Sequence, residues 1–115
     1  MSETDHKNLI VWQKSMELVV LVYKLTEAFP SSEIYGLTSQ MKRAAISIPS
    51  NIAEGRRRRS PKEFVHFLRI AFGSASELET QIEISERLKF GKLEYVNQTK
   101  ALLQEVIKML NKMST

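Results

Sequence analysis

Basic side chains are concentrated in one short part of this sequence. Between Gln40 and Lys62 a single acidic residue, Glu54, stands among seven basic ones, whereas the rest of the chain holds ten basic and twelve acidic residues. The seven are Lys42, Arg43, Arg56, Arg57, Arg58, Arg59 and Lys62. A guanidinium group donates paired hydrogen bonds that match the oxygen atoms of a phosphate, so consecutive arginines suit a polyanionic ligand.

Several interpretations of the arginine run, Arg56 to Arg59, remain open. In the first, the run and its basic neighbours bind RNA or DNA. No aromatic residue stands between the arginines, so the contact would be mostly with phosphate and would be weakly sequence-specific. In the second, the run meets an acidic protein, and the chain is a homo-oligomeric interaction scaffold with no nucleic-acid role. In the third, it is a solvated helix end, where cations interact favourably with the helix dipole.

Few residues of this sequence have the types and spacing that a metal or cofactor site needs. Glu63 and His66 form one Glu-x-x-His unit, and ferritin-like bundles need two such units with further glutamates. The only other histidine is His6, near the start of the chain, and Glu63 is already explained by a helix cap. Serines have no histidine at a suggestive spacing, and no glycine-rich phosphate loop is present. We therefore expect no metal, no cofactor, no small-molecule substrate and no enzymatic activity.

Two further polar groups each allow more than one interpretation. Glu77, Glu79, Glu83 and Glu86 form either a solvated acidic face or a surface that pairs with basic residues of a neighbouring subunit. Asn51 and Glu54 lie three residues apart, on one side of a helix. They could form hydrogen bonds between helices or act as a functional pair.

Composition limits the class of protein. The chain has 115 residues, a net charge of +4, a pI near 9.5 and no cysteine. A chain of this length buries enough surface to form a core without disulfides, so we expect one domain over residues 1–115. The first residues are polar, and the longest apolar run, Leu18 to Tyr23, is too short for a membrane span. These features predict a cytoplasmic protein that does not enter a membrane.

Apolar residues recur at alternating steps of three and four along most of the chain, which predicts amphipathic helices. The expected helices cover residues 8–29, 37–55, 60–88 and 92–113. Asn8 is a candidate N-cap, Pro30 ends the first helix, and Gly55 ends the second. Ser60, Pro61 and Glu63 form a capping box that starts the third. Short connections favour antiparallel neighbours, so the predicted fold is an all-α, up-down-up-down four-helix bundle.

The first and third helices are apolar beyond one face. Val19, Val20 and Leu21 lie between stripe residues, and Phe67 and Phe72 lie off the stripe of the third helix. This pattern fits either wide core faces or a second apolar surface covered by a partner, most simply a copy of the same chain.

Two residues disfavour helix where helix is predicted. Pro49 would remove a hydrogen bond, and Gly73 costs about 1 kcal/mol relative to alanine. One interpretation is an ordinary kink near Pro49 and a close helix crossing over Gly73. The other is that the kink aims Asn51, Glu54 and the arginines in a chosen direction.

The sequence also resembles a known family. The strings LIVWQKSMELVVLVYKLTEAFP, EIYGLTSQMKRAAISIPSNIAEGRRR and FLRIAFGSASELETQIEIS are similar to bacterial proteins encoded in intervening sequences of 23S ribosomal RNA genes. The resemblance extends from about Leu9 to Leu110, and SIPSNIAEG, at Ser47 to Gly55, is its most specific part. The resemblance implies a four-helix bundle that assembles as a homopentamer. Members usually have fewer consecutive arginines after the position of Gly55.

The fold is also similar to the accessory protein of diversity-generating retroelements. That protein is a pentameric bundle thought to contact nucleic acid through a basic surface. The resemblance therefore implies a basic nucleic-acid surface here, while the biochemical activity of the family is not established.

Overall fold

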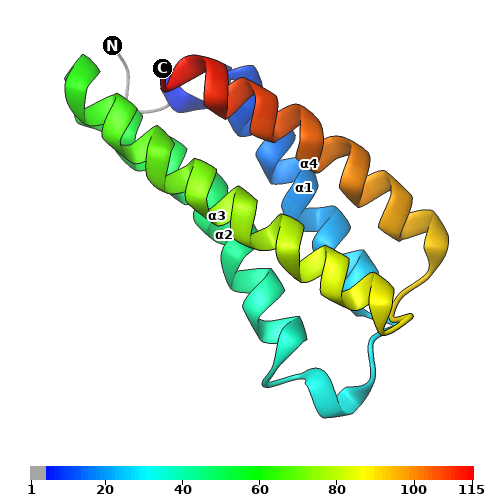
Figure 1. Ribbon diagram of the computed structural model, residues 1–115. Helices are drawn as coiled ribbons and strands as arrows, with labels where there is room; N and C mark the ends of the chain where they lie inside the picture. The colour runs from blue at the N-terminus through cyan, green and yellow to red at the C-terminus, as the bar shows by residue number, and fades with distance from the viewer. Residues whose placement is uncertain (1–4) are drawn as a thin grey trace.

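The computed structural model describes residues 5–115, which contain four long helices and no strand (Figure 1). The long helices are α1 (Ile10–Thr26), α2 (Leu37–Arg57), α3 (Pro61–Arg87) and α4 (Leu93–Met113). Two 3-10 helices, η1 (Asp5–Asn8) and η2 (Ser31–Glu33), precede α1 and α2. Each long helix packs against its neighbours in the chain, and α4 closes the bundle against α1. This arrangement confirms the predicted all-α, antiparallel four-helix bundle.

The predicted apolar stripes form one core at the centre of the bundle. The stripe residues of α1, which are Val11, Ser15, Leu18, Val22 and Leu25, are buried, as are the central residues of the other three stripes. The largest side chains that are less than 2 % exposed are Leu18, Leu25, Met41, Ile48, Ile52, Leu68, Leu78, Ile82, Leu103 and Leu110, with Val22 and Val106. α2 and α3 make the most extensive contact of any helix pair. Small buried residues, Ala44 and Ala45 in α2 and Ala71 and Ala75 in α3, lie along these two helices.

The helix ends follow some of the sequence signals and not others. The Ser60 hydroxyl accepts a hydrogen bond from the Glu63 amide at 3.3 Å, and Pro61 is the first residue of α3. Asn8 is not the N-cap of α1, because it belongs to η1, and Leu9 precedes the helix without a side-chain cap. α2 does not end at Gly55 but continues to Arg57.

The two helix glycines have different roles from those predicted. Gly55 is buried inside α2, and a Cβ atom there would lie 2.7 Å from the Cβ of Phe67 in α3. Gly55 is therefore the close crossing between helices. The predicted crossing over Gly73 is wrong, because a Cβ atom at Gly73 would meet no atom within 4 Å.

Pro49 lies inside α2 and is buried, and the helix is continuous through it. Side chains beside it bond to the helix carbonyls: Ser50 Oγ donates to the carbonyl of Ile46, and Asn51 Nδ2 donates to that of Ser47, both at 2.8 Å. Asn51 Nδ2 also donates to Ser47 Oγ at 2.9 Å, and Ser74 Oγ of α3 donates to the same oxygen at 2.8 Å. The Ser74–Ser47 hydrogen bond joins α2 to α3, whereas both bonds of Asn51 stay within α2, and Glu54 takes no part in this network.

No helix among residues 5–115 is both long enough and apolar enough to cross a membrane. The four long helices instead combine a buried stripe with polar outer positions.

Candidate nucleic-acid interface

The arginine run lies where α2 turns into α3, at the end of the bundle that also holds η1 and the C-terminus (Figure 1). Arg56 and Arg57 complete α2, Arg58 and Arg59 form the connection, and Lys62 lies in the first turn of α3. Arg59 has a positive φ of 55°, which reverses the chain direction within this short connection. We call the five basic residues of this turn the basic tip: Arg56, Arg57, Arg58, Arg59 and Lys62.

Two arginines of the basic tip are held against phenylalanine rings of α3. The guanidinium carbon of Arg56 lies 5.5 Å from the Phe64 ring centroid, and that of Arg58 lies 5.3 Å from the Phe67 centroid. A cation over an aromatic face is attracted by the ring quadrupole. Spacing along the chain did not place these aromatic residues beside the arginines, because they belong to the next helix. The available signal was Phe64 and Phe67 in the first two turns after the capping box.

The same arginines also make ion pairs. Arg56 Nε donates to Asp5 at 2.9 Å, and Arg58 Nε donates to Glu54 at 3.2 Å. All four side chains are between 24 % and 49 % exposed. Glu54, three residues from Asn51, is therefore a partner of the arginine run. Partly exposed pairs contribute little, about 0–1 kcal/mol, so a phosphate could displace the carboxylates.

A small cavity of about 220 Å³ opens beside these side chains. Its lining residues are Gly55, Arg56, Arg59, Ser60, Pro61 and Phe64. Arg56 and Arg59 thus approach one hollow from two sides of the turn, which favours an anionic group there.

Lys42 and Arg43 do not belong to the basic tip. They lie 14 and 13 residues before Arg56 on the same helix, which places them about 20 Å away at a rise of 1.5 Å per residue. The Lys42 ammonium lies 4.5 Å from the Tyr23 ring centroid, and Arg43 is exposed. The seven predicted site residues therefore form two groups.

Other basic residues extend the positive charge of this end. Arg69 of α3 donates to the carbonyl oxygen of Ser114 through Nε at 3.3 Å and through Nη2 at 3.2 Å. This contact sets the end of α4 well behind the start of α3, so the basic tip projects beyond the C-terminus (Figure 1). Lys7 and Lys112 lie at the same end of the bundle.

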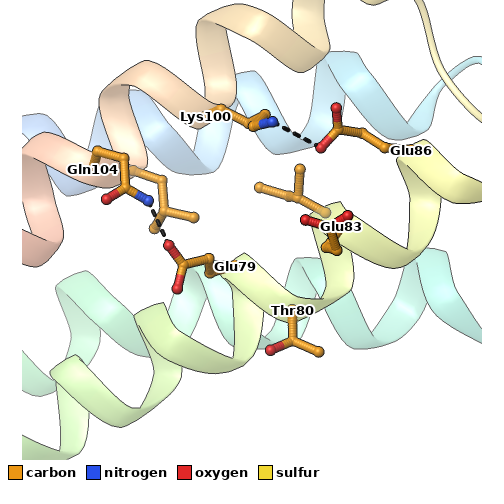
Figure 2. A pocket seen from close by; sticks show the side chains of 8 residues that line it. Glu79, Thr80, Glu83, Glu86, Lys100 and Gln104 are labelled. Carbon is orange, nitrogen blue, oxygen red and sulfur yellow. Dashed lines mark hydrogen bonds and ion pairs between the residues drawn. The ribbon is translucent and has the colours of Figure 1, made fainter.

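The acidic run lies on the other half of α3, beside α4. A groove of about 320 Å³ is lined by Glu79, Glu83 and Glu86 of α3 and by Lys100 and Gln104 of α4 (Figure 2). Lys100 pairs with Glu86 at 3.0 Å, and Gln104 donates to Glu79. The hydrogen bond and charge of Glu86 raise the pKa of Lys100. Three of the four glutamates thus line a groove whose polar contacts join two helices of one subunit.

Among residues 5–115, Glu63 and His66 are not brought together with a third side chain that could ligate a metal. His66 is exposed and packs edge-on against Phe67, with 5.4 Å between ring centroids. Within residues 5–115 no group of three or more histidine, aspartate or glutamate side chains converges on a common point. The expectation that the protein needs no metal or cofactor remains a prediction.

Comparison with known proteins identifies relatives of this chain. One solved structure, a protein of unknown function from the S23 ribosomal protein family of Bacteroides thetaiotaomicron VPI-5482, superposes with a TM-score of 0.79. The alignment has 25 % sequence identity and covers 92 % of this chain and 99 % of that protein. No curated protein matches. Residues 7–112 match the 23S rRNA-intervening sequence protein profile, and the chain belongs to that family.

Proposed function

We propose that this protein binds RNA or DNA without sequence specificity through the basic tip. The observation that carries the proposal is the gathering of Arg56, Arg57, Arg58, Arg59 and Lys62 on one projecting turn. Their positive fields add in the surrounding water and attract a polyanion. The phenylalanine contacts hold two guanidinium groups in place, which lowers the side-chain entropy that phosphate binding would otherwise remove.

Lys42 and Arg43 extend the proposed interface along α2. A separation of about 20 Å corresponds to roughly six nucleotides of one strand in a duplex. One nucleic acid lying along α2 could therefore contact both the basic tip and the pair Lys42 and Arg43.

We propose further that the chain self-associates and acts as a cytoplasmic binding protein rather than an enzyme. Met16, Val20 and Ile46 are 42–53 % exposed, Met16 and Ile46 line one groove between α1 and α2, and Val20 lies one turn beyond Met16. Exposed apolar clusters of this kind are typical of protein interfaces. Assembly would bring several basic tips together, and homopentamers are what the family resemblance implies.

Salt-dependent binding tests the nucleic-acid proposal. Equilibrium binding to structured and single-stranded RNA and DNA should weaken steeply with salt, with a log–log slope of about −0.7 to −0.9 per phosphate contact. Replacing Arg56, Arg57, Arg58 and Arg59 by glutamine should flatten that slope for every sequence. The matched control replaces Lys24, Arg87, Lys89 and Lys92, at the opposite end of the bundle, and should leave the slope close to that of the parent.

Two outcomes would overturn the proposal. If the tip variant binds as the parent does, the arginine run is a solvated helix end. If neither protein binds nucleic acid near physiological salt, the interaction scaffold with an acidic protein partner becomes the better account.

A further inference from the structure

The outer face of α3 carries features that a single subunit does not explain. Ile70 and Ile84 are 39 % and 43 % exposed, and Glu77 lies between them on the same side of the helix. Among the described residues no ion pair involves Glu77. Gly73 lies on this side too, with open space where its Cβ atom would be. A glycine inside a helix costs about 1 kcal/mol, and no contact within the subunit requires it.

The groove between α1 and α2 is a second surface without an explanation inside the subunit. Its volume is about 330 Å³, and it is lined by His6, Trp12, Met16, Val19, Ile46, Pro49, Ser50 and Ala53. Met16 and Ile46 are 43 % and 42 % exposed. His6 is only 7 % exposed, and its Nδ1 atom has no hydrogen-bond partner among the described residues. Lys42 and Arg43 lie just beyond the groove along α2.

The two surfaces match in height along the bundle. α2 and α3 meet at Arg59, so the height of a residue above this turn is about 1.5 Å for each position that separates it from Arg59. By this measure, three pairs of positions lie at nearly equal heights, roughly 16, 20 and 26 Å from the turn. They are Ile70 with Pro49, Gly73 with Ile46, and Glu77 with Lys42. The third pair has opposite charges, and the first two are apolar or small.

We propose that the outer face of α3 in one copy of this chain packs into the α1–α2 groove of a second copy. This inference rests on the self-association proposed above and names its two surfaces. Gly73 lets the neighbouring helix approach closely, Ile70 enters the apolar groove, and Glu77 faces Lys42 and Arg43. Because the surfaces differ, each copy uses one to contact the copy before it and the other to contact the copy after it.

This contact has a consequence for the whole assembly. Because each copy uses two different surfaces, the contact is head-to-tail, and repeated contacts form a ring when the rotation between copies closes. Equal heights keep every subunit pointing in the same direction. All basic tips then lie at one end of the ring, where their fields add.

Substitution of Gly73 tests the α3 surface without disturbing the subunit. Lysine at this position points into open space and favours helix more than glycine does. Gly73→Lys should therefore keep the helical circular dichroism spectrum and reduce the mass measured by light scattering to the 13.2 kDa of one chain. Ala101→Lys, at an exposed position of α4, is the matched control and should assemble as the parent does.

Mixing and charge reversal test how the two surfaces pair. Met16→Lys should block the groove, because Met16 lines it and is 43 % exposed, and should also give a monomer. An equal mixture of the Gly73→Lys and Met16→Lys variants should form a dimer through the one intact surface that each variant keeps. Glu77→Lys and the double variant Lys42→Glu, Arg43→Glu should each weaken assembly, and their combination should restore it.

The outcomes distinguish a failure of the proposed contact between the α3 face and the groove from a failure of self-association itself. A parent protein that is monomeric at high micromolar concentration would overturn both. An assembled parent whose Gly73→Lys variant keeps its mass would overturn the α3 contact and leave self-association standing. Variants that are monomeric alone and remain monomeric when mixed would show that the α3 face and the groove do not pair.

Discussion

At the scale of single residues, the arginines of the basic tip already have partners within the chain. Arg56 and Arg58 each contact one carboxylate and one phenylalanine ring. The ring fixes the position of the guanidinium group, and the carboxylate reduces its charge. Nucleic-acid binding would therefore be a competition between phosphate and carboxylate for the same donors.

This competition predicts that removing a carboxylate strengthens binding. Glu54→Gln should tighten RNA or DNA binding by about two- to five-fold at low salt, because an exposed ion pair is worth about 0.2–1 kcal/mol. Fluorescence anisotropy with one labelled oligonucleotide measures the change. Glu94→Gln, at the start of α4, removes the same charge at the opposite end of the bundle and should change affinity far less. Weaker binding by Glu54→Gln would contradict the competition.

His6 gives the fold a dependence on pH. Burial lowers the pKa of His6 from its ordinary value of 6.5, and the nearby Arg57 and Lys7 lower it further, against a smaller opposite effect of Asp5. A group whose pKa is lower in the folded state stabilises the fold above its unfolded pKa, and this contribution is lost as the pH falls through the folded value. Stability should therefore decrease as the pH falls from 7 towards 5.5.

Urea unfolding of two variants checks this pH dependence. His6→Gln should reduce the change in unfolding midpoint between pH 7 and 5.5. His66→Gln removes an exposed histidine and should leave that change as it is in the parent. An equal pH dependence in the parent and His6→Gln would show that another group is responsible.

At the scale of elements, much of the helical arrangement could be predicted from the sequence. The three-four spacing identified the buried faces, and Ser60 marked the start of α3 correctly. Spacing could not show which glycine lies at a helix crossing, because that depends on how two helices meet in space. For the same reason it could not bring Phe64 under Arg56. The distance of Lys42 from the arginine run, in contrast, follows from spacing along one helix.

The close approach of α2 and α3 predicts opposite effects at the two helix glycines. Gly55→Ala should destabilise the fold by about 1–3 kcal/mol, because the added methyl group overlaps Phe67. Gly73→Ala should stabilise an isolated subunit by up to about 1 kcal/mol through helix propensity. Urea midpoints at submicromolar protein concentration measure both changes. A Gly55→Ala variant as stable as the parent would mean that the crossing relaxes without strain.

At the scale of the whole molecule, one core holds all four helices together. Leu78→Ala should lower the free energy of unfolding by about 2–5 kcal/mol, because Leu78 is fully buried and its loss leaves a cavity. Leu93 is 70 % exposed, so Leu93→Ala in α4 should change stability by less than about 0.5 kcal/mol. Circular dichroism during urea unfolding distinguishes the two. An equal decrease in the free energy of unfolding for Leu78→Ala and Leu93→Ala would mean that the bundle is not organised around this core.

Charge is also distributed unevenly over the whole molecule. The basic tip and its neighbours occupy the end with η1 and the C-terminus, whereas Glu79, Glu83 and Glu86 lie along the groove in the other half of α3 (Figure 2). A polyanion would therefore approach one end and be repelled along the α3–α4 side. The central claim is that nucleic acid contacts the turn between α2 and α3.

Hydrogen–deuterium exchange with and without a structured RNA tests that claim most directly. The amides of Arg58 and Arg59 donate long hydrogen bonds of 3.3 and 3.4 Å in an exposed turn, so they should exchange rapidly in the free protein. Bound RNA should slow exchange in peptides that cover residues 55–62 and leave peptides that cover residues 79–86 unchanged. Saturating RNA that protects the acidic half of α3, or protects no peptide across the basic tip, would contradict the account.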